Sequence, residues 1–514
     1  MQFPRSSGIL LHPTSLPGKY GIGDLGKGAY DFADFLKITG QTIWQVLPLG
    51  PTSYGDSPYQ ATSSFAGNPL LICLDTLLEK GWLTDEDLPP ASDFNDYVVN
   101  YGPVIEYHNE ALTRSFARFN NSASVDDKAA FQKFCQEHKH WLDDYALFAA
   151  LKDSHDGKPW WEWPTGQAMR EAEEIDAARQ ALEESIQSHM YRQWLFFTQW
   201  EALRAHVNKL GIRFMGDIPI FVAHDSADTW GNRDIFYLDE AGNPIVIAGV
   251  PPDYFSATGQ RWGNPLYKWD VLKKTGYKWW KERIAATLKM VDMVRIDHFR
   301  GFAQYWAIPA EEETAVNGKW ENGPGVPFFE EMQKHFGDLP IVAEDLGFIT
   351  KEVYEIRDTF NLPGMKILQF AFETDVPNAF QPHTYPRNCV VYTGTHDNNT
   401  TLGWWNEVGE AIHKNVAAYA GPITDPPRDL MRVGMSSVAD TVIFPLQDVL
   451  GYGADTRMNF PGIGAGNWAW RFHQSALTAE IRLILGDMTY RFDRWHLTEE
   501  ERKARAGGSV HGAI

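Results

Sequence analysis

The feature that most constrains this chain is a series of short apolar runs, each closed by Gly, Pro or a polar cluster. Runs of this length are typical of strands that are buried on both faces of a parallel sheet. Helical patterns lie between several of them, for example at 29–38, 276–290 and 351–360. The candidate strands are 8–16, 42–49, 213–222, the runs that end at 297 and 344, 365–372, the run that ends near 397, and 441–446. Strands that alternate with helices predict an α/β fold, and eight of them predict a (β/α)8 TIM barrel.

The spacing of these runs is uneven, and the long gaps predict large insertions on the rim of the barrel. Between 49 and 213 we expect mainly helical structure, with patterns at 106–119, 127–152 and 168–210 and a Trp cluster at 160–163 in a connecting loop. The connection 223–277 is rich in Gly, Pro, Asp and Trp, and long loops usually act as lids or binding loops. We therefore expect barrel strands one and two in 1–75, a mainly helical inserted subdomain in 76–210, and barrel strands three to eight in 211–514 with a long binding-loop insertion at 223–277.

Composition narrows the class of partner. The net charge is −21, so the chain gains nothing from neutralising phosphates, and we expect neither nucleic acid nor an anionic membrane as a partner. No apolar run is long enough to span a bilayer, and the first residues lack a secretory apolar segment. The three cysteines have no metal-like spacing, which favours reduced thiols and a cytoplasmic location. The 20 Trp suit sugar faces as well as a core, although core packing is their more common role.

Acidic residues at strand ends are the candidate chemistry. Asp297, Glu344 and Asp397 each follow an apolar run, and the carboxyl ends of barrel strands carry the active site. Cleavage of a glycosidic bond needs one carboxyl group to protonate the leaving oxygen and one carboxylate to meet the anomeric carbon. Asp297 fits the nucleophile, and Glu344 fits the acid that later acts as a base. Arg295 is placed to hold Asp297 ionised and oriented, and His396 with Asp397 to bind sugar hydroxyls.

Other interpretations of these residues stay open. An acid after a strand is often a helix N-cap, a role that Asp345 would fill. Asp, Glu and His also bind divalent metals, but their order here reproduces no motif such as His-Glu-x-x-His. The segment 21–26 matches a glycine-rich phosphate loop only weakly, because it follows a loop with two prolines instead of a strand. We therefore expect neither a metal nor a cofactor.

Several segments taken together resemble one enzyme family. They are Gly-Ile-Leu-Leu-His-Pro-Thr-Ser-Leu-Pro at 8–17, Pro-Leu-Gly-Pro-Thr at 48–52, Ser-Pro-Tyr-Gln at 57–60, Arg-Ile-Asp-His-Phe-Arg at 295–300, Ala-Glu-Asp-Leu-Gly at 343–347 and Gly-Thr-His-Asp-Asn at 394–398. The chain resembles, over nearly its whole length, the 4-α-glucanotransferases of glycoside hydrolase family 77, called amylomaltases or disproportionating enzymes. The resemblance implies transfer of α-1,4-glucan segments from a donor malto-oligosaccharide to the 4-hydroxyl of an acceptor glucan or glucose. Expected substrates are malto-oligosaccharides, amylose and glucans derived from starch or glycogen.

The resemblance also assigns roles to residues. It makes Asp297 the nucleophile of a retaining double displacement, Glu344 the acid/base and Asp397 the transition-state stabiliser, with the first two carboxyl groups roughly 5–5.5 Å apart. It implies further sugar contacts by Arg295, His396, Tyr59 and Ser57 on the donor side, by Asp253, Tyr254 and Trp262 of the loop 249–265 on the acceptor side, and by Tyr54 and Tyr101 in a second glucan-binding groove. An α-1,4-glucan hydrolase on the same barrel and a non-catalytic glucan-binding protein are the alternatives.

Overall fold

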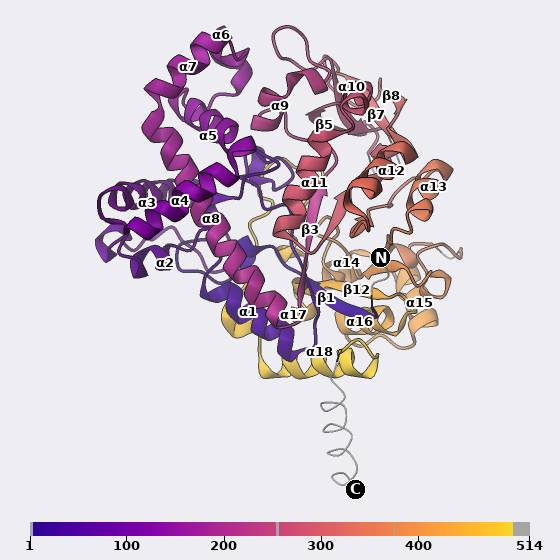
Figure 1. Cartoon of the computed structure of the whole chain (residues 1–514). Helices are drawn as coiled ribbons and strands as arrows, with labels where there is room; N and C mark the ends of the chain where they lie inside the picture. The colour runs from indigo at the N-terminus through magenta and orange to yellow at the C-terminus, as the bar shows by residue number, and fades with distance from the viewer. Residues whose placement is uncertain (1–3, 253–255, 375, 497–514) are drawn as a thin grey trace.

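The computed structural model describes residues 4–252, 256–374 and 376–496 (Figure 1). Asp253 and Tyr254, two of the predicted sugar contacts, lie outside the described residues. Within the described residues, eight parallel strands form one sheet in the order β10-β11-β12-β1-β2-β3-β6-β9. The two ends of this order meet, because the N–H of Ala343 in β9 donates to the carbonyl oxygen of Pro363 beside β10 (2.9 Å). The chain is therefore a (β/α)8 TIM barrel, which confirms the predicted fold class.

The barrel strands overlap the predicted apolar runs. They are β1 (Ser6–Leu10), β2 (Ile43–Gln45), β3 (Arg213–Pro219), β6 (Met293–Asp297), β9 (Ile341–Ala343), β10 (Gly364–Ile367), β11 (Cys389–Tyr392) and β12 (Thr441–Pro445). The first two strands are shorter than the runs at 8–16 and 42–49. Pro13 and Pro48 lie just beyond them, and a proline, which has no N–H, cannot continue a hydrogen-bonded ladder.

The long gap between β2 and β3 is mainly helical in the described structure, and Figure 1 shows these helices gathered on one side of the barrel. They are α3 (Tyr101–Ser122), α4 (Val125–Glu137), α5 (Lys139–Ser154), α6 (Thr165–Ala168), α7 (Ala172–Ala181) and α8 (Glu183–Lys209). The single pattern expected at 127–152 is two helices that meet at His138. Helix α8 reaches the barrel, where Trp200 packs against Phe214 of β3 (ring centroids 4.7 Å apart).

The connection 223–277 differs from the long loop that its composition predicts. It contains α9 (Ala227–Gly231), β4 (Val246–Val250), β5 (Gln260–Pro265) and α10 (Trp269–Lys274). Strands β4 and β5 join β7 (Gln304–Pro309) and β8 (Lys319–Asn322) in an antiparallel sheet with the order β5-β4-β7-β8. The partners of β4 come partly from the segment after β6, so no pattern within 223–277 alone could reveal the sheet. This small sheet stands on the rim beside the end of β6.

The remaining helices surround the barrel (Figure 1). They are α1 (Lys27–Ile38), α11 (Lys278–Met290), α12 (Gly325–Phe336), α13 (Lys351–Thr359), α14 (Thr401–Glu407), α15 (Glu410–Ala420), α16 (Pro426–Ser436), α17 (Leu446–Leu450) and α18 (Ala479–Arg491). Three of them match the helical patterns expected at 29–38, 276–290 and 351–360. Helix α2 (Leu74–Glu79) lies instead with the helices between β2 and β3, on the same side as α3 and α4 (Figure 1). No helix in the described ranges combines the length and the apolar character that a membrane crossing requires.

Candidate active site

The mouth of the barrel is built around one buried arginine. Arg295 of β6 lies in register with Asp217 of β3, and both side chains are almost fully buried. The guanidinium donates through Nη1 to Asp217 Oδ2 (2.7 Å) and through Nη2 to Asp297 Oδ1 (2.9 Å). Removal of one partner of a buried ion pair costs about 3–5 kcal/mol, because the other charge is left uncompensated. The two strands thus present three linked charges at one edge of the barrel.

The Arg295 guanidinium binds the carboxylates of Asp217 and Asp297, and these two side chains differ in solvent exposure. Burial lowers the pKa of Arg295, but Asp217 and Asp297 outweigh it and raise that pKa well above its ordinary value. Burial raises the pKa of Asp217 to about 7, a shift that Arg295 opposes and the charge of Asp297 increases. The side chain of Asp297 is 29% exposed, whereas that of Asp217 is fully buried. Asp297 is therefore the member of this group that a substrate can reach.

Asp217 is absent from the residues that we predicted for the site. It lies inside the apolar run 213–222 and not at its end, whereas the predicted acids each follow a run. The signal was present, since an unpaired carboxylate inside a buried strand is costly and implies a cationic partner. That the partner is Arg295 follows only from the pairing of β3 with β6.

Glu344 lies directly after β9 and is oriented by backbone N–H groups. Its Oε2 accepts from the N–H of His298 (2.7 Å), and its Oε1 accepts from the N–H of Leu346 (2.9 Å). His298 follows Asp297 and has a φ of 50°, a left-handed conformation that costs a non-glycine residue about 1–3 kcal/mol. This turn brings the residue next to Asp297 into contact with the carboxyl group of Glu344.

The environment of Glu344 favours its protonated form. Burial raises the pKa of this carboxyl group to about 8; the charge of Asp297 adds to the rise, while Arg295 and the two N–H donors oppose it. A proton donor needs a pKa near or above the working pH. Glu344 therefore meets the protonation requirement of a general acid.

His396 and Asp397 lie in the turn after β11. The Nε2 atom of His396 is 3.4 Å from Asp397 Oδ2, and burial lowers the pKa of the imidazole. The His396 side chain is 4% exposed, whereas that of Asp397 is 42% exposed. The turn is closed by Thr395, whose N–H and hydroxyl both donate to Asn398 Oδ1 (2.9 Å each).

Tyr59 connects the two groups of charges. Its hydroxyl donates to Asp217 Oδ2 (2.9 Å), and its ring stacks on His396 with centroids 5.2 Å apart. The first contact reaches the group around Arg295, and the second reaches the turn that carries Asp397. All three predicted acids therefore border one region of the barrel mouth.

Two further predicted residues border the same region. The hydroxyl of Ser57 accepts from the N–H of Tyr59 (3.2 Å), which fixes the loop that presents the Tyr59 ring. Trp262 of β5 stands edge-on to His298 with ring centroids 4.9 Å apart, so the small antiparallel sheet reaches the end of β6. The sugar-binding roles of both residues stay predictions.

The two tyrosines predicted for a second groove differ in exposure. Tyr54 is 78% exposed, whereas Tyr101 is only 8% exposed. The hydroxyl of Tyr101 donates to the backbone oxygen of Trp468 (3.0 Å), so its ring packs inside the fold. Only Tyr54 of this pair presents a ring face that a glucan chain can cover.

A segment that the sequence analysis did not single out completes the site. Residues 457–468, which we call the strap, follow α17 and cross the turn that carries Asp397. The Trp468 ring packs against Tyr59 and His396, with centroids 5.8 and 5.9 Å away. Asn459 donates from Nδ2 to Asp397 Oδ1 (2.6 Å). The strap has no strand or long helix pattern, and its Gly and Asn content indicated only a loop.

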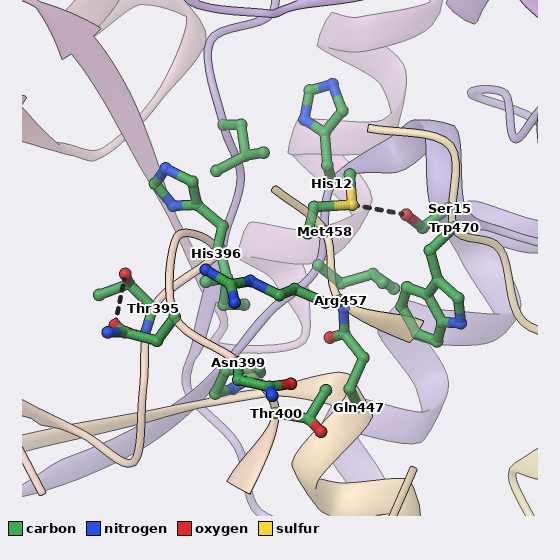
Figure 2. Close-up of a pocket in the computed structure, with 15 residues that line it drawn as sticks. His12, Ser15, Thr395, His396, Asn399, Thr400, Gln447, Arg457, Met458 and Trp470 are labelled. Atoms are coloured by element: carbon green, nitrogen blue, oxygen red, sulfur yellow. Dashed lines mark hydrogen bonds between the residues drawn. The ribbon is translucent and has the colours of Figure 1, made fainter. Parts of the chain in front are cut away.

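A small cavity lies behind the His396 turn. Figure 2 shows it between His12 at the end of β1, the segment from Thr395 to Thr400, and Arg457 with Met458 of the strap. Its volume is about 30 Å³, whereas ligand pockets begin at roughly 300 Å³. Burial lowers the pKa of His12 to about 3, so this imidazole is neutral. The cavity is too small for a sugar ring, and the partly exposed carboxylates of Asp297 and Asp397 remain the candidate sugar site.

No group of three or more His, Cys, Asp or Glu side chains in the described ranges is arranged to hold a metal ion.

Comparisons with known proteins identify the family. The model of glycoside hydrolase family 77, described as 4-alpha-glucanotransferase, matches residues 11–478. A 4-alpha-glucanotransferase of Thermus thermophilus is 51% identical over 93% of this chain and 97% of its own length. One of Synechocystis sp. is 50% identical over 92% of this chain and 95% of its own length. An amylomaltase from Streptococcus agalactiae, solved in complex with acarbose, superposes with a TM-score of 0.93 at 38% identity and covers 96% of this chain and 100% of its own. The chain therefore belongs to glycoside hydrolase family 77, the family of the 4-α-glucanotransferases.

Proposed function

We propose that this protein is a 4-α-glucanotransferase whose chemistry takes place between Asp297, Glu344 and Asp397. It transfers an α-1,4-glucan segment from a donor malto-oligosaccharide to the 4-hydroxyl of an acceptor glucan or of glucose. One observation supports this assignment above the others. Asp297 is bound to the Arg295 guanidinium, whereas the neighbouring Glu344 is buried with its pKa raised to about 8. A retaining glycosidase pair requires one ionised and one protonated carboxyl group.

In the first half of the proposed reaction, Asp297 attacks the anomeric carbon of the donor and the glycosidic bond breaks. Glu344 gives its proton to the departing oxygen, so the leaving glucan is released as an alcohol. The product is a glycosyl ester on Asp297 and an ionised Glu344. Asp397 accepts hydrogen bonds from ring hydroxyls, which strengthen as the sugar acquires positive charge. The Tyr59 ring covers the donor sugar.

In the second half, the ionised Glu344 takes a proton from the 4-hydroxyl of the acceptor, whose oxygen attacks the glycosyl ester. Asp297 leaves as a carboxylate, and Glu344 is again protonated. Two inversions at the anomeric carbon give net retention of the α configuration.

Transfer requires that an acceptor sugar outcompete water for the ester. Trp262 stands beside His298, and its ring offers an apolar surface on the acceptor side. Such a surface excludes water and holds a sugar ring in place. We assign Asp253 and Tyr254 of the loop 249–265 as further acceptor contacts.

The proposed substrates are malto-oligosaccharides, amylose and glucans derived from starch or glycogen. The acidic net charge of −21 supports the exclusion of nucleic acid and anionic membranes as partners. Cys73, Cys135 and Cys389 are free thiols, which supports a cytoplasmic location.

Incubation with maltotriose tests the activity. Disproportionation yields glucose together with oligomers longer than maltotriose, separated by anion-exchange chromatography. Products that are all shorter than maltotriose would show hydrolysis instead. Absence of turnover, with binding of maltotriose intact, would favour a non-catalytic glucan-binding protein.

A further inference from the structure

Residues of the strap form hydrogen bonds with the turn that carries Asp397. Asn459 contacts this turn twice, because its Nδ2 donates to Asp397 Oδ1 (2.6 Å) and its backbone N–H donates to the His396 oxygen (3.1 Å). Arg457 Nη2 donates to the backbone oxygen of Asp397 (2.6 Å), and its Nε donates to the backbone oxygen of Asn459 (2.8 Å). The side chain of Asn459 is the one that reaches the carboxylate itself.

The strap is itself closed by hydrogen bonds, so Asn459 is a fixed donor. The amide of Asn467 accepts from the N–H of Phe460 (3.0 Å) and donates to the oxygen of Ile463 (2.8 Å). The N–H of Trp468 donates to the oxygen of Met458 (2.8 Å). This bond joins Met458, the residue before Asn459, to Trp468 at the other end of the strap.

The turn also borders a void. The cavity of about 30 Å³ is lined by Thr395, His396 and Asn399 of the turn and by Arg457 of the strap (Figure 2). Close packing normally restricts a side chain to one rotamer. The Asp397 side chain is 42% exposed, so packing alone does not fix its carboxylate, and the hydrogen bond from Asn459 orients it.

Among the described residues, no Lys or Arg pairs with the carboxylate oxygens of Asp397. His396 faces Oδ2 at 3.4 Å, but burial lowers the pKa of this imidazole, so it is neutral near pH 7. The Arg457 guanidinium is bound to backbone oxygens. Asp397 also interacts electrostatically with Tyr59, and Arg295 and Asp297 interact electrostatically with His396. Asn459 is thus a neutral donor on a carboxylate that no Lys or Arg in the described part of the chain pairs with.

We propose that Asn459 is a positioning residue that fixes Asp397 for the sugar hydroxyls without neutralising it. This inference rests on the proposed function, because it takes Asp397 as the residue that binds those hydroxyls. A cation in place of the amide would hold Asp397 equally well but would weaken the bonds that it accepts from substrate. A neutral amide holds one lone pair and leaves the charge and the other lone pairs for the sugar.

Two substitutions at this position separate the roles. Asn459→Ala removes the donor at every pH, and we expect kcat on maltotriose to fall about 10-fold or more with a smaller change in KM. Asn459→Asp keeps the shape but donates only while it shares a proton with Asp397. We therefore expect its activity relative to the wild-type enzyme to rise as the pH falls from 8 to 5, whereas that of Asn459→Ala stays low throughout.

Asn467→Ala is the matched control. It weakens the same strap but lies outside contact with Asp397 in the bonds described above, so we expect a lower thermal midpoint and no such pH dependence. A wild-type enzyme without maltotriose disproportionation would overturn the proposed function itself. A fully active wild-type enzyme with an unchanged kcat in Asn459→Ala, or with a wild-type pH profile in Asn459→Asp, would overturn only the positioning role. Because Asn459→Asp is isosteric, it preserves the test even if Asn459→Ala does not fold.

Discussion

The two sides of the barrel mouth hold their carboxylates in different ways. On the strand side, Asp297 is bound by Arg295, which also binds Asp217, so buried charges hold one another. On the strap side, Asp397 is bound by the neutral amide of Asn459 and faces a neutral imidazole. The difference fits the two different tasks that we propose for these acids. A nucleophile needs a fixed and ionised oxygen. A carboxylate that accepts hydrogen bonds from sugar hydroxyls needs a fixed geometry and no cation on its oxygens.

The largest expected effect on the strand side comes from removal of the proposed nucleophile, Asp297. Asp297→Asn keeps the shape and most contacts of the side chain but abolishes the attack on the anomeric carbon. We expect disproportionation of maltotriose to fall by roughly 10⁴-fold or more. Asp270→Asn, at an exposed ion pair on α10, is the control for loss of a surface carboxylate. Substantial turnover by Asp297→Asn would remove the nucleophile assignment.

The second prediction separates the acid from the nucleophile on the same side. Glu344→Gln has no proton to give, so we expect about 10³-fold slower turnover of maltotriose. A donor with an activated leaving group needs no protonation, so its first step should survive. The ester on Asp297 should then accumulate, because no base activates the acceptor, and mass spectrometry of the peptide that contains Asp297 detects it. An adduct on another residue would contradict the proposed roles.

The third prediction concerns the pH dependence of activity that follows from the raised pKa of Glu344. Because burial raises the pKa of Glu344 to about 8, the acid is protonated below that pH and ionised above it. We therefore expect kcat/KM for maltotriose to fall about tenfold per pH unit above pH 8. The measurement is an initial-rate series from pH 5 to pH 10. A decline that begins near pH 5 would mean that Glu344 is ionised and cannot act as the acid.

The same shift affects stability, with the sign set by the direction of the pKa. A carboxyl group whose pKa is raised on folding stabilises the folded state less as the pH rises from 4.5 to about 8. Glu344→Gln removes this titration. The thermal midpoint of the variant, relative to that of the wild-type protein, should therefore rise between pH 4.5 and pH 8. We expect a gain of about 2–4 °C, measured by calorimetry at both pH values. A constant difference across the window would contradict the shift.

The smallest expected effect concerns Tyr54, an exposed residue beside the strap. Tyr54 is exposed and lies beside Gly464 of the strap, so it can stack on a long glucan that passes outside the mouth. We expect Tyr54→Ala to raise KM for amylose about 2- to 5-fold and to leave KM for maltotriose unchanged, since one aromatic contact contributes about 1 kcal/mol. Tyr490→Ala on α18 is the control. An equal effect on both substrates would place Tyr54 outside a second groove.

Much of the strand side follows from local sequence. Each of Asp297 and Glu344 comes directly after an apolar run, and Arg295 is two residues from Asp297, so strand assignment alone places them at one rim. The strap side was harder to predict. Asn459 and Trp468 lie in a segment without periodicity, and their contacts to Asp397 and Tyr59 join residues far apart in the chain. The exposure of Tyr54 and the burial of Tyr101 likewise depend on neighbours that no local pattern names.

The sequence by itself determined the strands, the helices between them and the acids at the strand ends. These features are local, because apolar runs, prolines and glycines act on the residues beside them. Only the tertiary structure decided that Asp217 pairs with Arg295, that β4 and β5 form a sheet with β7 and β8, and that Asn459 binds Asp397. Each of these depends on which distant segments meet, and the partner of a hydrogen bond or an ion pair is set by packing in three dimensions.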